Sequence, residues 1–311
     1  MNKVKATVII PTTIDRGMLL PFSVGSVQNQ TVKDIEIFII GDGVYDETRE
    51  VIHDLQSKDS RIKFFDHPKH ERRGEVYRHM ALQEAKGEIV CYLCDRDLML
   101  PDHIEAHSSA LQSYDFSCSM HIRIRPDQKP VLDSFALYFG DFSENKVDLR
   151  VRLGGLSTAA HRLDFYKKLP FGWRATPEGK ATDMYMWNQF YDVANFRAFS
   201  ISEPTILYFK RKPHPGWSSA QRLPELIEWH NRLVNDIDID HFKKETILEL
   251  IKENKHVREK KNLLENELQQ LKKMLDFHSP NRTYNFMERF NIGKTLSSFR
   301  KSGRLKWPWN T

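Results

Sequence analysis

The stretch "IVCYLCDRDLMLPDH", residues 89–103, places two carboxylates directly after an apolar run. Such a run is typical of a buried strand, and Asp95 and Asp97 follow where this strand is expected to end. Positions three apart in a strand point to opposite faces, so we expect Cys91 and Cys94 not to form a redox pair or a zinc site. The two aspartates fit a polar turn as well as a ligand site, because short acidic pairs are common in turns.

Strand and helix patterns alternate on both sides of this stretch. We expect strands at 6–12, 35–43, 62–67 and 88–95, separated by helices at 19–28, 46–57 and 74–87. Later segments predict strands at 117–126 and 203–209 and helices within 154–169 and 181–193. This alternation predicts an α/β fold with a mostly parallel sheet covered on both faces, whose ligands bind at the carboxyl ends of the strands.

Composition and charge narrow the class of protein. The chain has 311 residues, of which 40% are hydrophobic and 29% charged, as in a soluble globular protein. No apolar run is long enough to span a bilayer or to act as a signal peptide, so we expect a cytoplasmic location. The net charge of the chain is +5. Residues 279–311 hold seven Lys/Arg and one acid, so this tail carries a charge of +6, and the remaining residues together carry −1. With basicity confined to the tail, we expect no nucleic-acid partner.

A heptad pattern follows the α/β segment. Apolar positions alternate at spacings of three and four, interrupted by two polar residues, at Ile247, Leu250, Asn254, Val257, Lys261, Leu264, Leu268, Leu271 and Leu275. This pattern predicts a coiled coil over 247–275 that joins copies of the chain into a dimer or trimer. The alternative is an ordinary amphipathic helix packed on its own domain.

The last segment mixes basic and aromatic residues. Over 282–309 this pattern suits peripheral contact with an anionic membrane at its inner face; the alternatives are a tail that docks on its own subunit or is disordered. We therefore divide the chain into a domain over 1–225, a helical extension with the heptads over 226–278, and a basic amphipathic tail over 279–311.

Five segments of the chain resemble family 2 glycosyltransferases of the GT-A fold, and the resemblance covers about residues 5–220. They are "VIIPT", "SVQNQTVKDIEIFIIGDGVYDET", "GEVYRHMALQEAKGEIVCYLCDRDLMLPDHIE", "ATDMYMW" and "YFKRKPHPGWSS". The resemblance implies an inverting enzyme, dependent on Mn²⁺ or Mg²⁺, that moves a sugar from a nucleotide-diphosphate sugar to a hydroxyl of a glycan or lipid-linked acceptor. Family habit and the tail together suggest surface polysaccharide or O-antigen assembly.

The resemblance also implies a donor site. Pro11, Thr12 and Asp42 would hold the base and ribose of the nucleotide. Arg73 or Arg78 would pair with phosphate or with the acidic metal cluster, unless both belong to a solvated helix face.

A metal site and a closing loop follow from the same resemblance. Asp97 is the first choice for metal contact, with Asp95 on ribose or metal-bound water, and His214 would complete the site. Arg96 interrupts the acids and either points away or weakens metal binding. A loop closing over the diphosphate would contain Trp217, Ser218, Ser219 and Arg222.

Asp183 matches the general base of inverting relatives, where a carboxylate must deprotonate the acceptor hydroxyl as it attacks the anomeric carbon. Three departures from the family pattern, Gly41, Arg96 and Thr182, support an alternative hypothesis. In that hypothesis the chain is a catalytically weak relative that acts as a scaffold or assembly protein through its coiled coil and basic tail.

Overall fold

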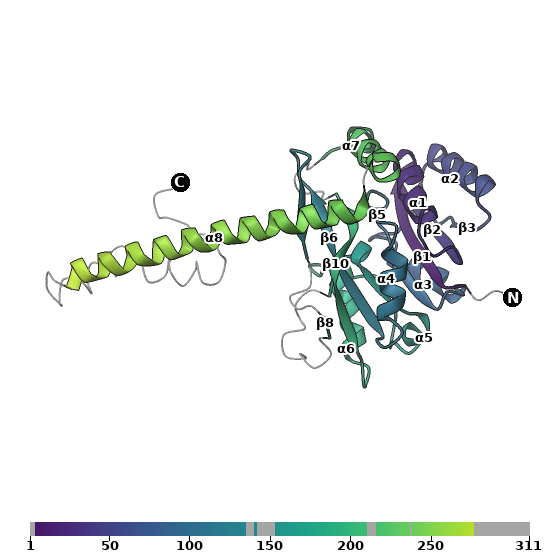
Figure 1. Cartoon of the computed structure of the whole chain (residues 1–311). Helices are drawn as coiled ribbons and strands as arrows, with labels where there is room; N and C mark the ends of the chain where they lie inside the picture. Colours follow the sequence, from purple (N-terminus) through teal and green to yellow (C-terminus); the bar gives the residue numbers. More distant parts are fainter. Residues whose placement is uncertain (1–3, 135–139, 142–152, 210–215, 237, 277–311) are drawn as a thin grey trace. The chain divides into compact units, whose positions relative to one another are not determined.

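The computed structural model describes residues 4–134, 140–141, 153–209, 216–236 and 238–276 (Figure 1). The chain divides into one compact unit, Met1–Leu250, and a second unit, Ile251–Thr311. The described strands form a ten-stranded sheet in the order β3-β2-β1-β4-β9-β6-β10-β5, with β7 on β6 and β8 on β10.

The first half of the sheet is parallel. Its strands are β1 (Ala6–Ile14), β2 (Ile35–Val44), β3 (Ile62–Phe65) and β4 (Ile89–Tyr92). The connections contain η1 (Gly17–Leu19), α1 (Leu20–Gln28), α2 (Asp46–Lys58) and α3 (Glu75–Gln83). Both the element order and the parallel pairing agree with the prediction from the sequence.

The second half of the sheet is mixed. β6 (Phe116–Ile124) and β10 (Ala198–Tyr208) run parallel to each other. The short strands pair antiparallel with their neighbours: β5 (Leu98–Met99), β7 (Pro130–Asp133), β8 (Gly140–Asp141) and β9 (Ala159–Arg162). The expected parallel character therefore holds for the first half, and the sheet as a whole is mixed. The remaining helices of the compact unit are α4 (His103–Ala110), α5 (Leu163–Tyr166), α6 (Thr182–Tyr191), α7 (Ser219–Asn231) and η3 (Arg232–Asp236).

The helix expected within 154–169 occupies only the second part of this segment. The structure has a turn, η2 (Leu156–Thr158), then β9, and only one turn of helix in α5. Ala159 and Ala160 are fully buried because β9 fills the gap between β4 and β6. Burial between two strands thus overrides the helix preference of the two alanines.

Alternate residues of the central strands enter different cores. Ile9, Val90 and Tyr92 face a core that contains residues of α3, α5 and α6. Val8 and Cys91 face a second core that contains residues of α1, α2 and α4. Helices therefore cover both faces of the sheet, as predicted. Cys91 and Cys94 are free thiols packed against different cores, which confirms that they do not form a pair.

Helix α3 ends at Gln83, four residues before the predicted stop at Gly87. Gly87 instead passes so close to β1 that a Cβ there would lie 2.3 Å from the backbone nitrogen of Thr7. Its own N–H donates to Thr7 Oγ1 over 3.1 Å. The glycine therefore serves a close approach of two backbones and does not cap the helix.

The compact unit continues beyond the predicted boundary at residue 225. Leu226, Trp229 and Phe242 are buried in a third core with Leu98 and Leu207. They come from α7 and from the start of α8 (Ile239–Asp276).

Helix α8 is continuous over 38 residues and includes the predicted heptads. Beyond Leu250 most of the described apolar side chains are exposed, for example Val257 at 63% and Leu271 at 56%, whereas Leu268 is half-buried. The tail over 279–311 lies outside the described residues. Among the described helices, none combines the length and the apolar character needed to cross a membrane.

Candidate active site

Residues at the carboxyl ends of β1 and β4 meet around Asp95. Thr12 Oγ1 donates to Asp95 Oδ2 over 3.2 Å, and Arg16 Nη1 lies 3.1 Å from Asp95 Oδ1. Pro11 lies just before Thr12, opposite Ile40 of β2. The structure thus brings together the predicted Thr12 and Asp95 and adds Arg16, which the sequence analysis missed.

Asp97 is enclosed by the protein. Its side chain is fully buried, with Oδ2 accepting from Ser157 Oγ over 2.6 Å and Oδ1 accepting from the backbone N–H of Phe209 over 3.1 Å. Burial raises the pKa of Asp97, and the nearby Arg96 guanidinium acts in the opposite direction. Each oxygen therefore already has a partner within the chain.

The donor set around Asp95 and Asp97 fits a divalent metal poorly. Asp97 has no exposed surface, Asp95 is ion-paired with Arg16, and Arg96 adds a second positive charge between them. Within the described residues, no three His, Cys, Asp or Glu side chains are grouped as metal ligands. The predicted ligand His214 lies outside the described residues. In this arrangement Asp97 is not directed toward a bound ion, as the predicted role of Asp97 in metal binding requires.

Asp183 lies in the first turn of α6 and is half-buried. Its Oδ2 accepts from the backbone N–H of Leu156 over 3.1 Å. Leu156 and Ser157 are consecutive residues of η2, so one turn of chain holds both Asp183 and Asp97. Burial raises the pKa of Asp183, and the charge of Arg78 opposes this shift. A partly exposed carboxylate with a raised pKa is suited to accept a proton.

Gly154 makes this turn possible. Its φ of +116° is a conformation that residues with a Cβ rarely adopt, and a Cβ there would lie 2.9 Å from Thr158 Oγ1. The glycine thereby directs the chain into η2.

Arg78 is buried beside Asp183 rather than beside Asp95. Its guanidinium lies 4.8 Å from the Trp173 ring centroid, and Nη2 donates to the backbone oxygen of Arg73 over 3.0 Å. Burial lowers the pKa of Arg78, and Asp183 and Glu75 oppose the shift. Its Nε and Nη1 are buried and have no hydrogen-bond partner among the described residues. Arg78 therefore does not lie on a solvated helix face, and the carboxylates that act on its pKa are Asp183 and Glu75 rather than Asp95 and Asp97 of the expected metal cluster.

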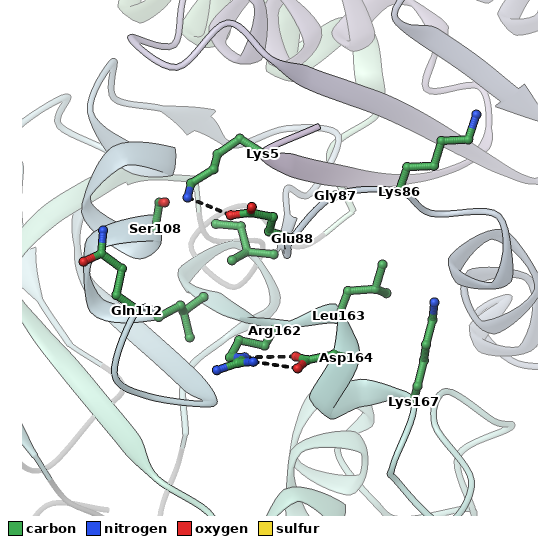
Figure 2. Close-up of a pocket in the computed structure, with 12 residues that line it drawn as sticks. Lys5, Lys86, Gly87, Glu88, Ser108, Gln112, Arg162, Leu163, Asp164 and Lys167 are labelled. Atoms are coloured by element: carbon green, nitrogen blue, oxygen red, sulfur yellow. Dashed lines mark hydrogen bonds and ion pairs between the residues drawn. The ribbon is translucent and has the colours of Figure 1, made fainter. Parts of the chain in front are cut away.

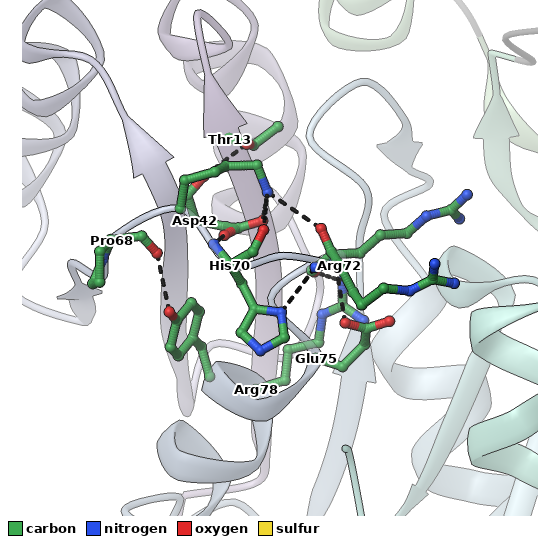
Figure 3. Close-up of polar contacts among 10 residues, drawn as sticks. Thr13, Asp42, Pro68, His70, Arg72, Glu75 and Arg78 are labelled. Carbon is green, nitrogen blue, oxygen red and sulfur yellow. Dashed lines mark hydrogen bonds and ion pairs between the residues drawn. The ribbon is translucent and has the colours of Figure 1, made fainter. Parts of the chain in front are cut away.

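Arg73, the second arginine candidate, has an exposed side chain. Its backbone N–H donates to Glu75 Oε2 over 3.0 Å at the start of α3 (Figure 3).

Asp42 organises the chain at the carboxyl end of β2 (Figure 3). Its carboxylate forms an ion pair with Lys69 Nζ and accepts from the backbone N–H of His70 over 2.6 Å. Gly43, at φ +68°, lets Lys69 approach, because a Cβ there would lie 2.5 Å from Lys69 Cβ. Thr13 Oγ1 donates to the Asp42 carbonyl oxygen over 2.7 Å. Asp42 thus fixes the segment that leads from β3 toward α3.

The predicted closing loop leads into α7. Trp217 is exposed, and Ser218 caps the helix in a capping box with Gln221. Arg222 is buried, and burial lowers its pKa, with repulsion from Arg96 and Arg16 as the next causes. Three guanidinium groups from separate parts of the chain therefore lie near one another.

A surface hollow of about 470 Å³ lies at the other end of the strands, where β1 and β4 begin (Figure 2). Lys5 and Glu88, just before β1 and β4, line it and form an ion pair of 2.8 Å. Arg162 and Asp164 form a second pair of 2.6 Å. Because this hollow lies at the amino ends of the strands, whereas ligands of such sheets bind at the carboxyl ends, we do not assign the active site to it.

Comparisons with known proteins identify relatives by sequence. The chain is 38% identical over 96 residues to the GalNAc(5)-diNAcBac-PP-undecaprenol beta-1,3-glucosyltransferase of Campylobacter jejuni, covering 31% of each chain. It is 29% identical over 110 residues to an uncharacterised glycosyltransferase of Haemophilus influenzae, covering 34% of this chain and 41% of that one. The chain thus spans less than half the length of these two relatives.

Structure and family comparisons agree with the predicted fold. The crystal structure of S. aureus TarS in complex with UDP-GlcNAc superposes with a TM-score of 0.56 at 17% identity, over 79% of this chain and 71% of that one. This likeness establishes the GT-A fold. The family model described as Glycosyl transferase family 2 matches residues 7–168. Because this match spans more than half of the sequence, the chain belongs to glycosyl transferase family 2.

Proposed function

We propose that this protein transfers a sugar from a nucleotide-diphosphate sugar to a hydroxyl group of an acceptor, with inversion at the anomeric carbon. The observation that carries the proposal is Asp183, a half-buried carboxylate fixed by the N–H of Leu156 beside the strand-end site. Family membership supports a glycosyltransferase activity. The same membership underlies the assignment of a nucleotide sugar as donor.

In the proposed reaction, Asp183 accepts the proton of the acceptor hydroxyl as its oxygen bonds to the anomeric carbon. The bond from that carbon to the diphosphate breaks, and the electron pair leaves with the nucleoside diphosphate. Positive side chains near Asp95 stabilise the charge that develops on this leaving group. Asp42 and Thr12 hold the nucleoside part of the donor. The donor set described above does not support the Mn²⁺ or Mg²⁺ of the sequence hypothesis, so no step is assigned to a metal.

For the acceptor we propose a glycan or a lipid-linked glycan. The name of the Campylobacter jejuni relative, which contains PP-undecaprenol, supports this class. The basic and aromatic sequence of 282–309 supports peripheral contact with an anionic membrane surface at its cytoplasmic face. Surface polysaccharide or O-antigen assembly is the pathway consistent with both.

A donor screen by thermal shift tests the binding part of the proposal. The full chain is heated with UDP-, GDP-, ADP- and dTDP-sugars at saturating concentration. We expect one nucleotide class to raise the melting temperature, because a ligand that binds only the folded state stabilises it by mass action. A melting temperature unchanged by every donor would contradict the proposed donor site.

We further propose that the heptads of α8 join copies of the chain into a dimeric or trimeric coiled coil. The heptad side chain Leu264 is 42% exposed and Leu271 is 56% exposed, so this face is available within the helix. Polar residues at two core positions, Asn254 and Lys261, favour a fixed register.

Light scattering on point variants tests the coiled coil. We expect the double variant Leu264→Lys and Leu271→Lys to have the mass of a single chain, because lysines at facing core positions bury unpaired charge. The matched control is Leu263→Lys, which lies off the heptad stripe at 62% exposure and leaves the mass unchanged. Equal masses for the wild type and the double variant would exclude assembly through these heptads.

A further inference from the structure

We propose that three arginines, Arg16, Arg96 and Arg222, hold the diphosphate of the donor, and that the donor binds without a divalent metal. This inference rests on the proposed function and specifies the chemistry of its donor site.

The carboxylates are the first argument. In a metal-dependent site, carboxylates bridge a cation to the diphosphate, which requires oxygens that face the ligand. Asp97 is fully buried, and its two oxygens accept hydrogen bonds from Ser157 Oγ over 2.6 Å and from the backbone N–H of Phe209 over 3.1 Å. Asp95 uses Oδ1 for Arg16 and Oδ2 for Thr12. Neither aspartate is arranged as a ligand to an added cation.

The local backbone explains this arrangement. The N–H of Asp97 donates to the carbonyl oxygen of Cys94 over 3.0 Å, so 94–97 form a turn after β4 has ended at Tyr92. Because the chain turns there, Asp95 and Asp97 do not share a face as alternate residues of a strand would. Arg96, at the tip of this turn, is partly exposed, while both neighbouring aspartates are buried.

The positions of the arginines are the second argument. Arg16 directly precedes η1, and Arg222 lies in the first turn of α7, which packs against η1. Arg96 Nε donates to the backbone oxygen of Phe209 over 3.1 Å, which fixes its side chain beside β10. Repulsion from Arg96 and Arg16 contributes to the lowered pKa of Arg222. The three guanidinium groups therefore come from three separate parts of the chain and lie near one another.

The cluster offers an anion the hydrogen-bond donors of three guanidinium groups. The carboxylates that act on Arg222 are Glu225 and Asp95, and Glu225 Oε1 accepts from Gln128 Nε2 over 3.1 Å. Asp97 points inward, so Asp95 is the carboxylate that directly pairs with the cluster. Guanidinium groups bind phosphate oxygens in bidentate fashion and keep their charge at every physiological pH. They can therefore provide the charge stabilisation that a metal ion provides in other enzymes.

Calorimetric titration of the full chain with UDP, GDP, ADP and dTDP, each in EDTA and in Mn²⁺, tests the inference. We expect the nucleotide that binds to have the same Kd in both buffers, within about threefold. Binding that requires Mn²⁺, or that Mn²⁺ tightens by more than about tenfold, a difference of 1.4 kcal/mol, would overturn the inference and leave the proposed transferase intact. No binding in either buffer would contradict the proposed function itself.

Variants of the arginines test whether the three-arginine cluster binds the nucleotide, or whether the loss of any positive charge weakens binding. We expect Arg96→Gln and Arg222→Lys each to weaken nucleotide binding in EDTA by about tenfold, because each loses charge-assisted hydrogen bonds. Arg96 is partly exposed, so its variant is expected to fold, and the melting temperature of each variant checks this. The matched control is Arg232→Gln, which changes a partly exposed arginine in η3 that lies over the Trp229 ring, and its melting temperature is checked in the same way. Unchanged affinity in the folded variant Arg96→Gln would refute the role of the cluster.

Discussion

Asp183→Asn is expected to slow sugar transfer by roughly 100- to 10,000-fold, the range that general base catalysis contributes. Asparagine keeps an oxygen that can accept from the N–H of Leu156, so the turn at η2 and the start of α6 are retained. It cannot accept a proton at neutral pH. The donor contacts proposed for Thr12, Asp42 and the arginines do not involve this side chain, so donor affinity is expected to change little.

The measurement compares transfer rate and donor affinity in the same preparation. A suitable control is Asp192→Asn, which changes an exposed aspartate at the other end of α6 and is expected to retain full activity. Transfer by Asp183→Asn at the wild-type rate would show that another group is the base.

Arg78→Met is expected to move the acidic limb of the pH–rate profile to higher pH. Arg78 opposes the rise in the pKa of Asp183 that burial causes. Without this positive charge the pKa of Asp183 rises further, and the base is protonated over a wider range of pH. A base acts only when it is deprotonated. At a fixed pH below the limb, the transfer rate therefore falls by about tenfold for each pH unit by which the limb moves to higher pH.

The profile is measured on Arg78→Met and on the charge-retaining variant Arg78→Lys. Methionine keeps an apolar contact with the Trp173 ring, which limits the loss of packing. Lysine retains a positive charge, so its limb is expected to lie closer to that of the wild type. A uniform loss of rate with an unmoved limb would indicate that Arg78 only supports the fold.

The sequence predicted the first half of the sheet well. The apolar runs of β1, β2 and β4 are short, bounded by polar residues and separated by helices with clear periodicity, so local pattern determines both type and order. From that order alone, Thr12 and Asp95 were expected at the same edge, and they share a hydrogen bond of 3.2 Å.

The rest depends on tertiary structure that no local pattern reveals. The strand β9 is formed because the sheet has a gap between β4 and β6, and its sequence "AAHR" has no strand period. Arg16 and Ser157 belong to no motif, and only the fold places them against Asp95 and Asp97. The orientation of Asp97 could not be inferred either, because the strand period does not apply to the turn formed by 94–97.

The most direct test of the central claim is the release of nucleoside diphosphate from a panel of nucleotide sugars by the full chain, with Asp183→Asn in parallel. The proposed glycosyltransferase is expected to turn over the donor identified by the thermal-shift screen, slowly with water and faster with a hydroxyl acceptor, and the variant is expected to lose this turnover. A folded wild-type chain that binds the donor and releases no nucleoside diphosphate would contradict the account and favour a scaffold protein.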